Sequence, residues 1–228
     1  MKNKEQEIID MILEMKKLGY PDEKIVEDFE TKLLKLHNLK LSQFFPVNIK
    51  GADVKAHGQV IIDSEDLEEN YEFATHVKGA DVKAHGMVIA NSGNLLYNYK
   101  FARDAKGADT WAHEQVILDS KNLEYNYIFA RDVKKANVRA HGKVIIDSGD
   151  LEYNYKFASD VKGADVRAHG KVIINSGSIE YNEKFKLIEG SDIDAHVTAI
   201  NNTKIQKCKE SLNECLDSMI KEKVKVKK

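Results

Sequence analysis

The sequence predicts an all-α protein, a right-handed α-solenoid of stacked two-helix repeats with a helical cap at each end. Three observations favour this fold. One segment recurs through residues 49–187, helix-capping residues recur twice in each copy, and no proline follows Pro46. Repeats of about 20–50 residues are typical of solenoids, in which each unit buries its apolar face against its neighbours. Because proline breaks helix interiors, its absence permits one helix after another.

Residues 1–48 precede the repeats and are expected to form the N-terminal cap. A helical apolar stripe runs through residues 5–18, at Ile8, Ile9, Ile12 and Met15. Gly19 ends this helix, and proline just ahead of Asp22 starts a second one that runs to about Asn38. Such atypical terminal units are expected to seal the apolar faces of a solenoid.

Five tandem copies of the repeat follow the N-terminal segment. The copies span residues 49–76, 77–104, 105–132, 133–160 and 161–187. Within the fourth copy, Leu151, Tyr155, Ala158 and Val161 follow the i, i+4, i+7, i+10 spacing of a helix face. The β-branched run 144–146 could instead form a strand, which leaves a β-solenoid with one strand per coil as the alternative.

Capping residues favour helices over strands in both halves of each copy. The first cap position holds Asp53, Asp81, Asp109, Asn137 and Asp165, and the second holds Asp66, Asn94, Asn122, Asp150 and Ser178. All ten side chains carry a short oxygen that can accept a hydrogen bond from the first helical turn. A glycine one or two residues earlier often accompanies them, as at Gly51 and Gly149, and suits the end of the preceding helix. Each copy is therefore predicted to be two helices of about ten residues joined by tight turns.

Residues 188–228 are expected to hold a degraded sixth repeat, a capping helix over about 204–221 and a Lys-rich tail. Cys208 and Cys215 lie about two helical turns apart, roughly 10 Å, which is too far for a disulfide. We expect reduced thiols partly packed under the last helix, with a redox role as the alternative. The charged start, the lack of a long apolar run and the reduced thiols predict a cytoplasmic protein that does not enter a membrane.

A histidine recurs in every copy and invites a metal hypothesis. The series is His57, His85, His113, His141 and His169, with His196 in the degraded unit. Stacked helices lie about 8–10 Å apart, too far for imidazoles to share a zinc ion, and no second ligand motif accompanies the series. We expect each histidine to bond the cap carboxylate four residues earlier, as Asp53 precedes His57. The predicted chemistry therefore includes no metal, no cofactor and no catalytic residue.

A second recurrent series consists of asparagines. Its members are Asn70, Asn98, Asn126, Asn154 and Asn182. They resemble the asparagine ladders that tie neighbouring repeats together, because a buried amide needs several hydrogen-bond partners. Beside them, Tyr99 and Phe101 are expected in the core, with Tyr97 at its rim, although such rings could also stack nucleic-acid bases.

Large apolar side chains replace charged or polar residues at a few positions in the second and third copies. The substitutions are Met87, Leu96, Trp111 and Ile128, and Glu114 replaces a glycine. Trp111 takes the place of the Lys or Arg of the other copies, so its position is predicted to face solvent, and Glu114 is expected on the same face. Tryptophan is enriched at binding hot spots. We hypothesise that Trp111 with Met87 anchors a partner protein, with neutral divergence of the copies as the alternative.

Basic residues form a further series near the start of each first helix. It comprises Lys50, Lys78, Lys106, Lys134 and Lys162, with Lys55, Lys83, Arg139 and Arg167 close by. Such a stripe could follow a phosphate backbone. An acidic series balances it, however, and the net charge of the chain is −2. An ordinary solvated surface is the simpler interpretation, and nucleic-acid binding is the alternative.

Residues 129–137 (Phe-Ala-Arg-Asp-Val-Lys-Lys-Ala-Asn) and 153–158 (Tyr-Asn-Tyr-Lys-Phe-Ala) resemble short tandem repeats in uncharacterised proteins of low-GC bacteria and their phages. The resemblance covers residues 49 to about 200 and implies a helical array without assigned chemistry. Some small proteins of mobile elements inhibit host defence complexes by direct binding. Together these points predict a non-enzymatic protein-binding module, such as an inhibitor or an adaptor. Self-association through an apolar patch is also compatible with the sequence.

Overall fold

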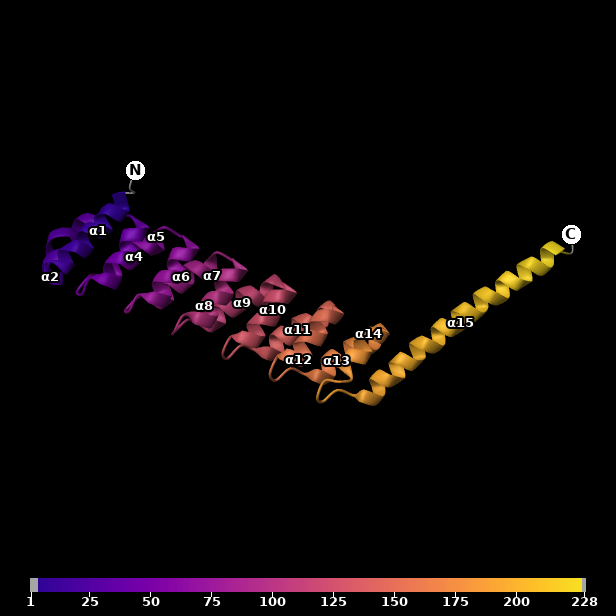
Figure 1. The fold of residues 1–228 in the computed structure, drawn as a ribbon. Helices are drawn as coiled ribbons and strands as arrows, with labels where there is room; N and C mark the ends of the chain where they lie inside the picture. Colours follow the sequence, from indigo (N-terminus) through magenta and orange to yellow (C-terminus); the bar gives the residue numbers. More distant parts are fainter. Residues whose placement is uncertain (1–3, 227–228) are drawn as a thin grey trace. The chain divides into compact units, whose positions relative to one another are not determined.

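The computed structural model describes the backbone of residues 4–226 and the side chains of residues 4–219. Every regular element in that range is a helix, and consecutive helices pack against each other (Figure 1). The predicted all-α solenoid of two-helix repeats is therefore confirmed. The alternative of a β-solenoid is wrong, since the described residues contain no strand.

The N-terminal segment contains more elements than the sequence predicted. These are α1 (Lys4–Lys17), α2 (Asp22–Ile25), a π-helix η1 (Val26–Glu30), α3 (Thr31–Leu34) and α4 (Leu39–Asn48). The helix predicted from Asp22 to Asn38 is thus interrupted by a π-helical turn and stops at Leu34. Phe45 of α4 lies one repeat length before Phe73, and both side chains are fully buried. Helix α4 therefore has the position of a second helix that precedes the first complete copy.

Each of the five copies forms two helices of similar length. The first helices are α5 (Val54–Asp63), α7 (Val82–Asn91), α9 (Thr110–Ser120), α11 (Val138–Ser148) and α13 (Val166–Ser176). The second helices are α6 (Leu67–His76), α8 (Leu95–Asp104), α10 (Leu123–Asp132), α12 (Leu151–Asp160) and α14 (Ile179–Phe185). Each of these ten helices starts directly after its predicted cap residue. Asp53 Oδ1, for example, accepts a hydrogen bond from Ala56 N at 3.0 Å, and Asp66 Oδ1 accepts one from Glu69 N at 3.0 Å.

The core repeats with the same period as the sequence. One phenylalanine from each second helix is 0% exposed: Phe45, Phe73, Phe101, Phe129, Phe157 and Phe185. One isoleucine from each first helix is also 0% exposed: Ile61, Ile89, Ile117, Ile145 and Ile173. Burying a side chain of this size stabilises the fold by about 1.5–3 kcal/mol. Because both residues recur in each copy, every repeat brings its own share of the core.

The chain divides into two compact units, and the division falls inside the third copy. The first unit comprises residues 1–120 and 133–136, and the second comprises residues 121–132 and 137–228. In the first unit, α5 contacts α7 and α7 contacts α9, while α4, α6 and α8 form the matching row of second helices. The second unit repeats this arrangement, with α11, α13 and α15 in one row and α10, α12 and α14 in the other.

The last helix, α15 (Ile193–Val226), is one continuous element rather than a degraded repeat followed by a separate capping helix. Its first turns pack in the second unit, where Ile200 is buried. Beyond them α15 runs past α13 and α14 (Figure 1), and every side chain from Lys204 to Met219 is exposed. Cys208 and Cys215 are therefore exposed, and the expectation that they pack under the last helix is wrong.

No helix in the described part of the chain combines the length and apolar character that crossing a lipid bilayer requires.

Candidate functional site

The recurrent histidine and asparagine meet at the junctions between repeats. Figure 1 shows the helices that carry them, such as α6 and α7. His85 Nδ1 lies 2.8 Å from Asn70 Oδ1, and both side chains are 0% exposed. The same pair recurs as His113–Asn98, His141–Asn126, His169–Asn154 and His196–Asn182, at 2.6–2.8 Å. The predicted asparagine ladder is thus confirmed, whereas the predicted bond from each histidine to its own cap carboxylate is wrong.

The asparagine amide fixes the tautomer of its histidine partner. Asn70 Nδ2 donates to Ile61 O at 3.0 Å and to Asp66 O at 2.7 Å, so its Oδ1 is left to face His85. An oxygen can only accept, and therefore His85 Nδ1 carries the proton. Asn70 consequently links three elements, which are both helices of its own repeat and the first helix of the next, and Asn98, Asn154 and Asn182 make the same bonds.

Burial keeps these imidazoles neutral. It lowers the pKa of His57, His85, His113, His141 and His169 to about 4, and it lowers the pKa of His196 in the same direction. The nearest cap carboxylate opposes this effect only weakly, as Asp81 does for His85. Each ring also packs on a buried phenylalanine, with centroids 5.0 Å apart for Phe73 and His85. The series therefore connects repeats through buried, neutral rings.

The described residues contain no group of three or more His, Cys, Asp or Glu side chains placed to hold a metal ion. Successive histidines of the series belong to different junctions. From His85 onward each ring uses Nδ1 for its asparagine, and Nε2 of His85 has no hydrogen-bond partner among the described residues. The partner of these Nδ1 atoms is an amide oxygen rather than a metal ion.

Glycine in the middle of four of the five first helices allows the repeats to approach. A Cβ added to Gly86 would lie 2.9 Å from Phe101 Cε1 and 3.3 Å from His113 Nε2. Gly58, Gly142 and Gly170 have the same surroundings, with the nearest Phe carbon at 3.1–3.2 Å. In the sequence these glycines stand out mainly as the residue that Glu114 replaces. Their fixed position within a helix, where glycine costs stability, was the signal of close packing.

The first junction departs from this scheme. Ser42 replaces the asparagine, and neither Ser42 Oγ nor the ring nitrogens of His57 has a hydrogen-bond partner among the described atoms. Instead, Glu30 Oε1 lies 3.4 Å from His57 Nε2 and accepts a hydrogen bond from Asp53 N at 2.6 Å. Burial raises the pKa of Glu30, although the bond from Asp53 N opposes this. The π-helical turn that ends at Glu30 places a carboxylate where later repeats have glycine.

Two of the predicted partner-binding residues lie exposed on the row of first helices. Trp111 on α9 is 67% exposed and Met87 on α7 is 57% exposed, and these two helices contact each other. Met87 also lines a groove of about 730 Å³ between α5 and α7, together with Ile62, Ala84 and Val88. Sequence reasoning did not identify this groove, because its walls come from two copies.

Glu114 does not belong to that surface. Its side chain is only 6% exposed, so the prediction that it shares an exposed face with Trp111 is wrong. A spacing of three residues turns a helix by about 300°, and at this position the turn takes the chain from solvent to the interior. Glu114 instead shares its register with Glu30, three repeat lengths earlier, which is the other acidic residue at the glycine position.

The remaining two predicted residues belong to second helices. Leu96 on α8 is 42% exposed. Ile128 on α10 is only partly buried and packs against the core around Tyr127 and Phe157 in the second unit. They are thus on the other row of helices from Trp111 and Met87, as the sequence suggested, and do not extend that surface.

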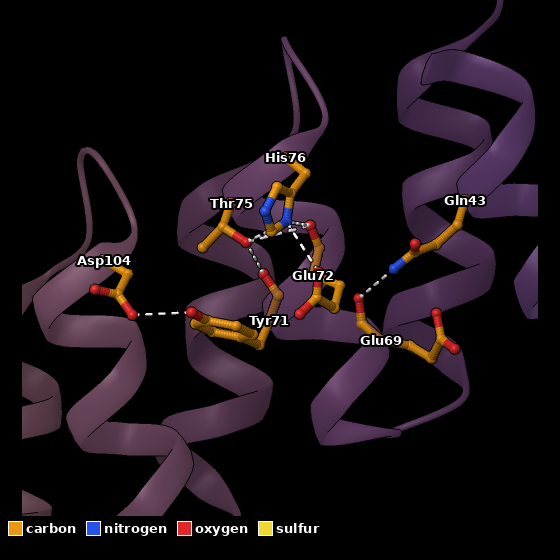
Figure 2. A network of polar contacts seen from close by, with 7 residues as sticks. All are labelled: Gln43, Glu69, Tyr71, Glu72, Thr75, His76 and Asp104. Atoms are coloured by element: carbon orange, nitrogen blue, oxygen red, sulfur yellow. Dashed lines mark hydrogen bonds and ion pairs between the residues drawn. The ribbon is translucent and has the colours of Figure 1, made fainter. Parts of the chain in front are cut away.

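The second helices of the first unit carry a polar network instead (Figure 2). Tyr71 Oη donates to Asp104 Oδ2 at 2.8 Å, which links α6 to α8, and Gln43 Nε2 donates to Glu69 O at 3.4 Å, which links α4 to α6. Burial and the bond to Asp104 raise the pKa of Tyr71 to about 12. Tyr71 is thereby occupied in holding repeats together, and the same holds for Tyr127 with Asp160 in the second unit.

The nine residues of the proposed basic stripe are all exposed: Lys50, Lys55, Lys78, Lys83, Lys106, Lys134, Arg139, Lys162 and Arg167. They alternate with the exposed cap carboxylates Asp53, Asp81, Asp109 and Asp165. Each of these four carboxylates accepts a hydrogen bond from its own helix and lies beside the stripe. The positive field of the stripe is weakened accordingly.

Comparison with known proteins adds no assignment, since no family model, no curated protein and no solved structure matches the chain. The resemblance to repeats of low-GC bacteria and phages stays a prediction.

Proposed function

We propose that this chain is a non-enzymatic protein-binding module, acting as an inhibitor or an adaptor, and that its partner docks on the row of first helices around Trp111. The observation that carries the proposal is the 67% exposure of this indole on a regular helix. Trp111 has the register at which Lys55, Lys83 and Arg139 occur in the neighbouring copies. A fold that tolerates a cation there does not need an indole for stability.

Met87 and the groove beside it support the same surface. Met87 is exposed where the other copies have Gln or Lys, and its flexible side chain suits an adaptable interface. The groove between α5 and α7 offers apolar walls at Ile62 and Val88 with polar groups such as Asp63 and Asn91 at its edge. Aromatic anchors beside such concave surfaces are characteristic of protein interfaces.

A pull-down from nuclease-treated native lysate tests the proposal, with wild type compared with Trp111→Ala. The matched control is Lys83→Ala, which truncates the equivalent position of the preceding copy. We expect a protein that is recovered with wild type and Lys83→Ala and lost with Trp111→Ala. Its affinity should fall by at least about 2 kcal/mol in the Trp111 variant. A change within about 0.5 kcal/mol would exclude Trp111 as an anchor.

The second candidate function is nucleic-acid binding by the basic stripe, which the exposure of all nine side chains favours. Phosphate contacts make affinity fall steeply with rising salt concentration. The affinity of an interface centred on Trp111 should change little with salt. A salt titration of the recovered complex therefore separates the two functions. Loss of all recovery after nuclease treatment, equally in both variants, would support the stripe.

A further inference from the structure

The exposed part of α15 carries a continuous apolar seam. Ile205, Leu212 and Met219 are 52–59% exposed, and Cys208 and Cys215 are exposed between them. These five residues alternate in steps of three and four, which is the spacing of the a and d positions of a coiled coil. From Lys204 to Met219 the helix spans about 24 Å, and none of its side chains is covered by the described chain.

The start of α15 is firmly held, so the seam is presented on a fixed support. Asp192 Oδ1 accepts from Ala195 N at 3.1 Å, and His196 Nδ1 lies 2.6 Å from Asn182 Oδ1. Ile200 is buried in the second unit. Thr203 Oγ1 donates to Gly177 O at 3.0 Å, which fixes the last turn before the exposed segment. The seam begins within one turn of this contact.

The start of α15 differs from the first helices of most repeats at one packing position. Val197 follows His196 as Gly170 follows His169, so it stands at the glycine register. At Gly170 a Cβ would lie 3.1 Å from Phe185 of the same repeat and 3.3 Å from His196 of the next one. The valine side chain, which is 39% exposed, adds bulk at this register, although the third copy accommodates Glu114 there. A single helix laid along the seam does not involve this register.

We propose that the seam of α15 pairs with α15 of a second copy of this chain. The seam is self-complementary, because all three large residues are at a positions and both cysteines are at d positions. An antiparallel copy sets a against d, so Leu212 faces Cys215 and Met219 faces Cys208 of the second copy, and each of these four central layers joins a large side chain to a small one. Ser211 and Ser218 flank the seam and permit close approach. No charged residue lies in these layers.

A parallel pair fits the same residues less well. It would stack Cys208 on Cys208 and Cys215 on Cys215, and it would leave these layers underfilled. It would also set Lys204 of one copy against Lys209 of the other, at positions where opposite charges normally stabilise a coiled coil. The antiparallel arrangement is the one that the side-chain volumes support, and it gives a closed two-fold dimer.

Sedimentation equilibrium of the full chain in reducing buffer tests the proposal, from low micromolar concentration upward. We expect the mass to rise from 25.8 kDa towards twice that value with concentration. Leu212→Asp places a charge in the centre of the seam and should raise the dissociation constant at least tenfold. The matched control Asn213→Asp makes the same charge on the adjacent, outward-facing position and should leave the dimer intact. Circular dichroism should show equal helix content in both variants, because both positions are exposed.

Four outcomes would overturn the proposal. A wild-type chain that stays monomeric at every concentration would show that the seam does not pair two copies, and the seam would then suit a helix of another protein. A dimer unaffected by Leu212→Asp would place the interface elsewhere, and loss of the dimer in Trp111→Ala would place it on the first helices. Rapid disulfide cross-linking of the wild-type dimer on mild oxidation would contradict the antiparallel orientation, because only a parallel pair brings like cysteines face to face.

Discussion

His85 Nδ1 and Asn70 Oδ1 lie 2.8 Å apart at the junction of two repeats, and this bond is the polar connection that the array repeats. Around it, the asparagine amide bonds two carbonyl groups of its own repeat. The His85 ring packs on Phe73, which belongs to the repeat of Asn70, with ring centroids 5.0 Å apart. The junction therefore joins a satisfied polar network to an aromatic contact, and each of these parts can be tested separately.

Replacing Asn70 by alanine should destabilise the first unit strongly. The substitution leaves the buried N–H of His85 without its partner, which costs about 1–3 kcal/mol, and it also removes the bond that Asn70 donates to Ile61 O. Hydrogen exchange of the α6 and α7 amides is the suitable measurement, since repeat arrays can unfold locally. Asn91→Ala, at an exposed position of α7, is the control and should leave exchange unchanged. Equal protection in both variants would show that the network contributes nothing.

Gly86→Ala should destabilise the protein although alanine favours helices. The gain in helix propensity is about 1 kcal/mol, whereas overpacking a core typically costs about 1–3 kcal/mol. The added Cβ would meet Phe101 at 2.9 Å, which atoms do not tolerate without movement. Gly58→Ala is the graded comparison, because its Cβ would lie 3.2 Å from Phe73. Urea unfolding should rank wild type above Gly58→Ala and Gly58→Ala above Gly86→Ala, and a more stable Gly86→Ala would refute the packing argument.

The histidine series predicts loss of stability in mild acid. The pKa of His85 falls to about 4 in the folded chain, from an ordinary value of 6.5, because burial disfavours the charged ring. The unfolded chain therefore binds protons first, so stability is complete above pH 6.5 and declines as the pH falls towards 4. Each such histidine contributes at most about 3 kcal/mol over this interval.

Circular dichroism during urea unfolding at a series of pH values measures this effect. The unfolding midpoint should fall continuously between pH 6.5 and 4, since five histidines share the lowered pKa. A chain with His85→Gln should lose stability at neutral pH but show a shallower decline in acid. A midpoint that is constant from pH 7 to pH 5 would mean that the rings take up protons in the folded chain as readily as in the unfolded one.

Trp111→Lys should leave the fold unchanged and remove the proposed anchor. Lysine stands at this register in the first two copies, and exposed substitutions usually alter stability by less than about 0.5 kcal/mol. Because Trp111 is the single tryptophan and is 67% exposed, wild-type fluorescence should be that of a hydrated indole and readily quenched by acrylamide. Binding of a partner at this surface should protect the indole. An emission typical of a buried indole in the free chain would contradict the exposed position.

The repeat period, the ten helix caps and the class of fold could be predicted from the sequence, because they depend on residues close together in the chain. A cap residue bonds a backbone amide three residues later, as Asp53 bonds Ala56. The 28-residue period follows from burial of one phenylalanine and one isoleucine per copy, such as Phe73 and Ile61. Local hydrogen bonding and apolar periodicity together determine two-helix units that must stack.

The partners of the buried polar groups, by contrast, were decided only by tertiary structure. Sequence spacing placed His85 beside Asp81 on its own helix, but stacking brought Asn70 of the preceding repeat closer, and a buried ring takes the partner that remains out of water. The same stacking buried Glu114 and left Trp111 in solvent, although both interrupt the repeat pattern. The sequence alone thus determined which helices form and how often they recur. Which of their faces meet, and hence which side chains remain for a partner, depended on contacts between repeats, because burial is a property of the assembled stack.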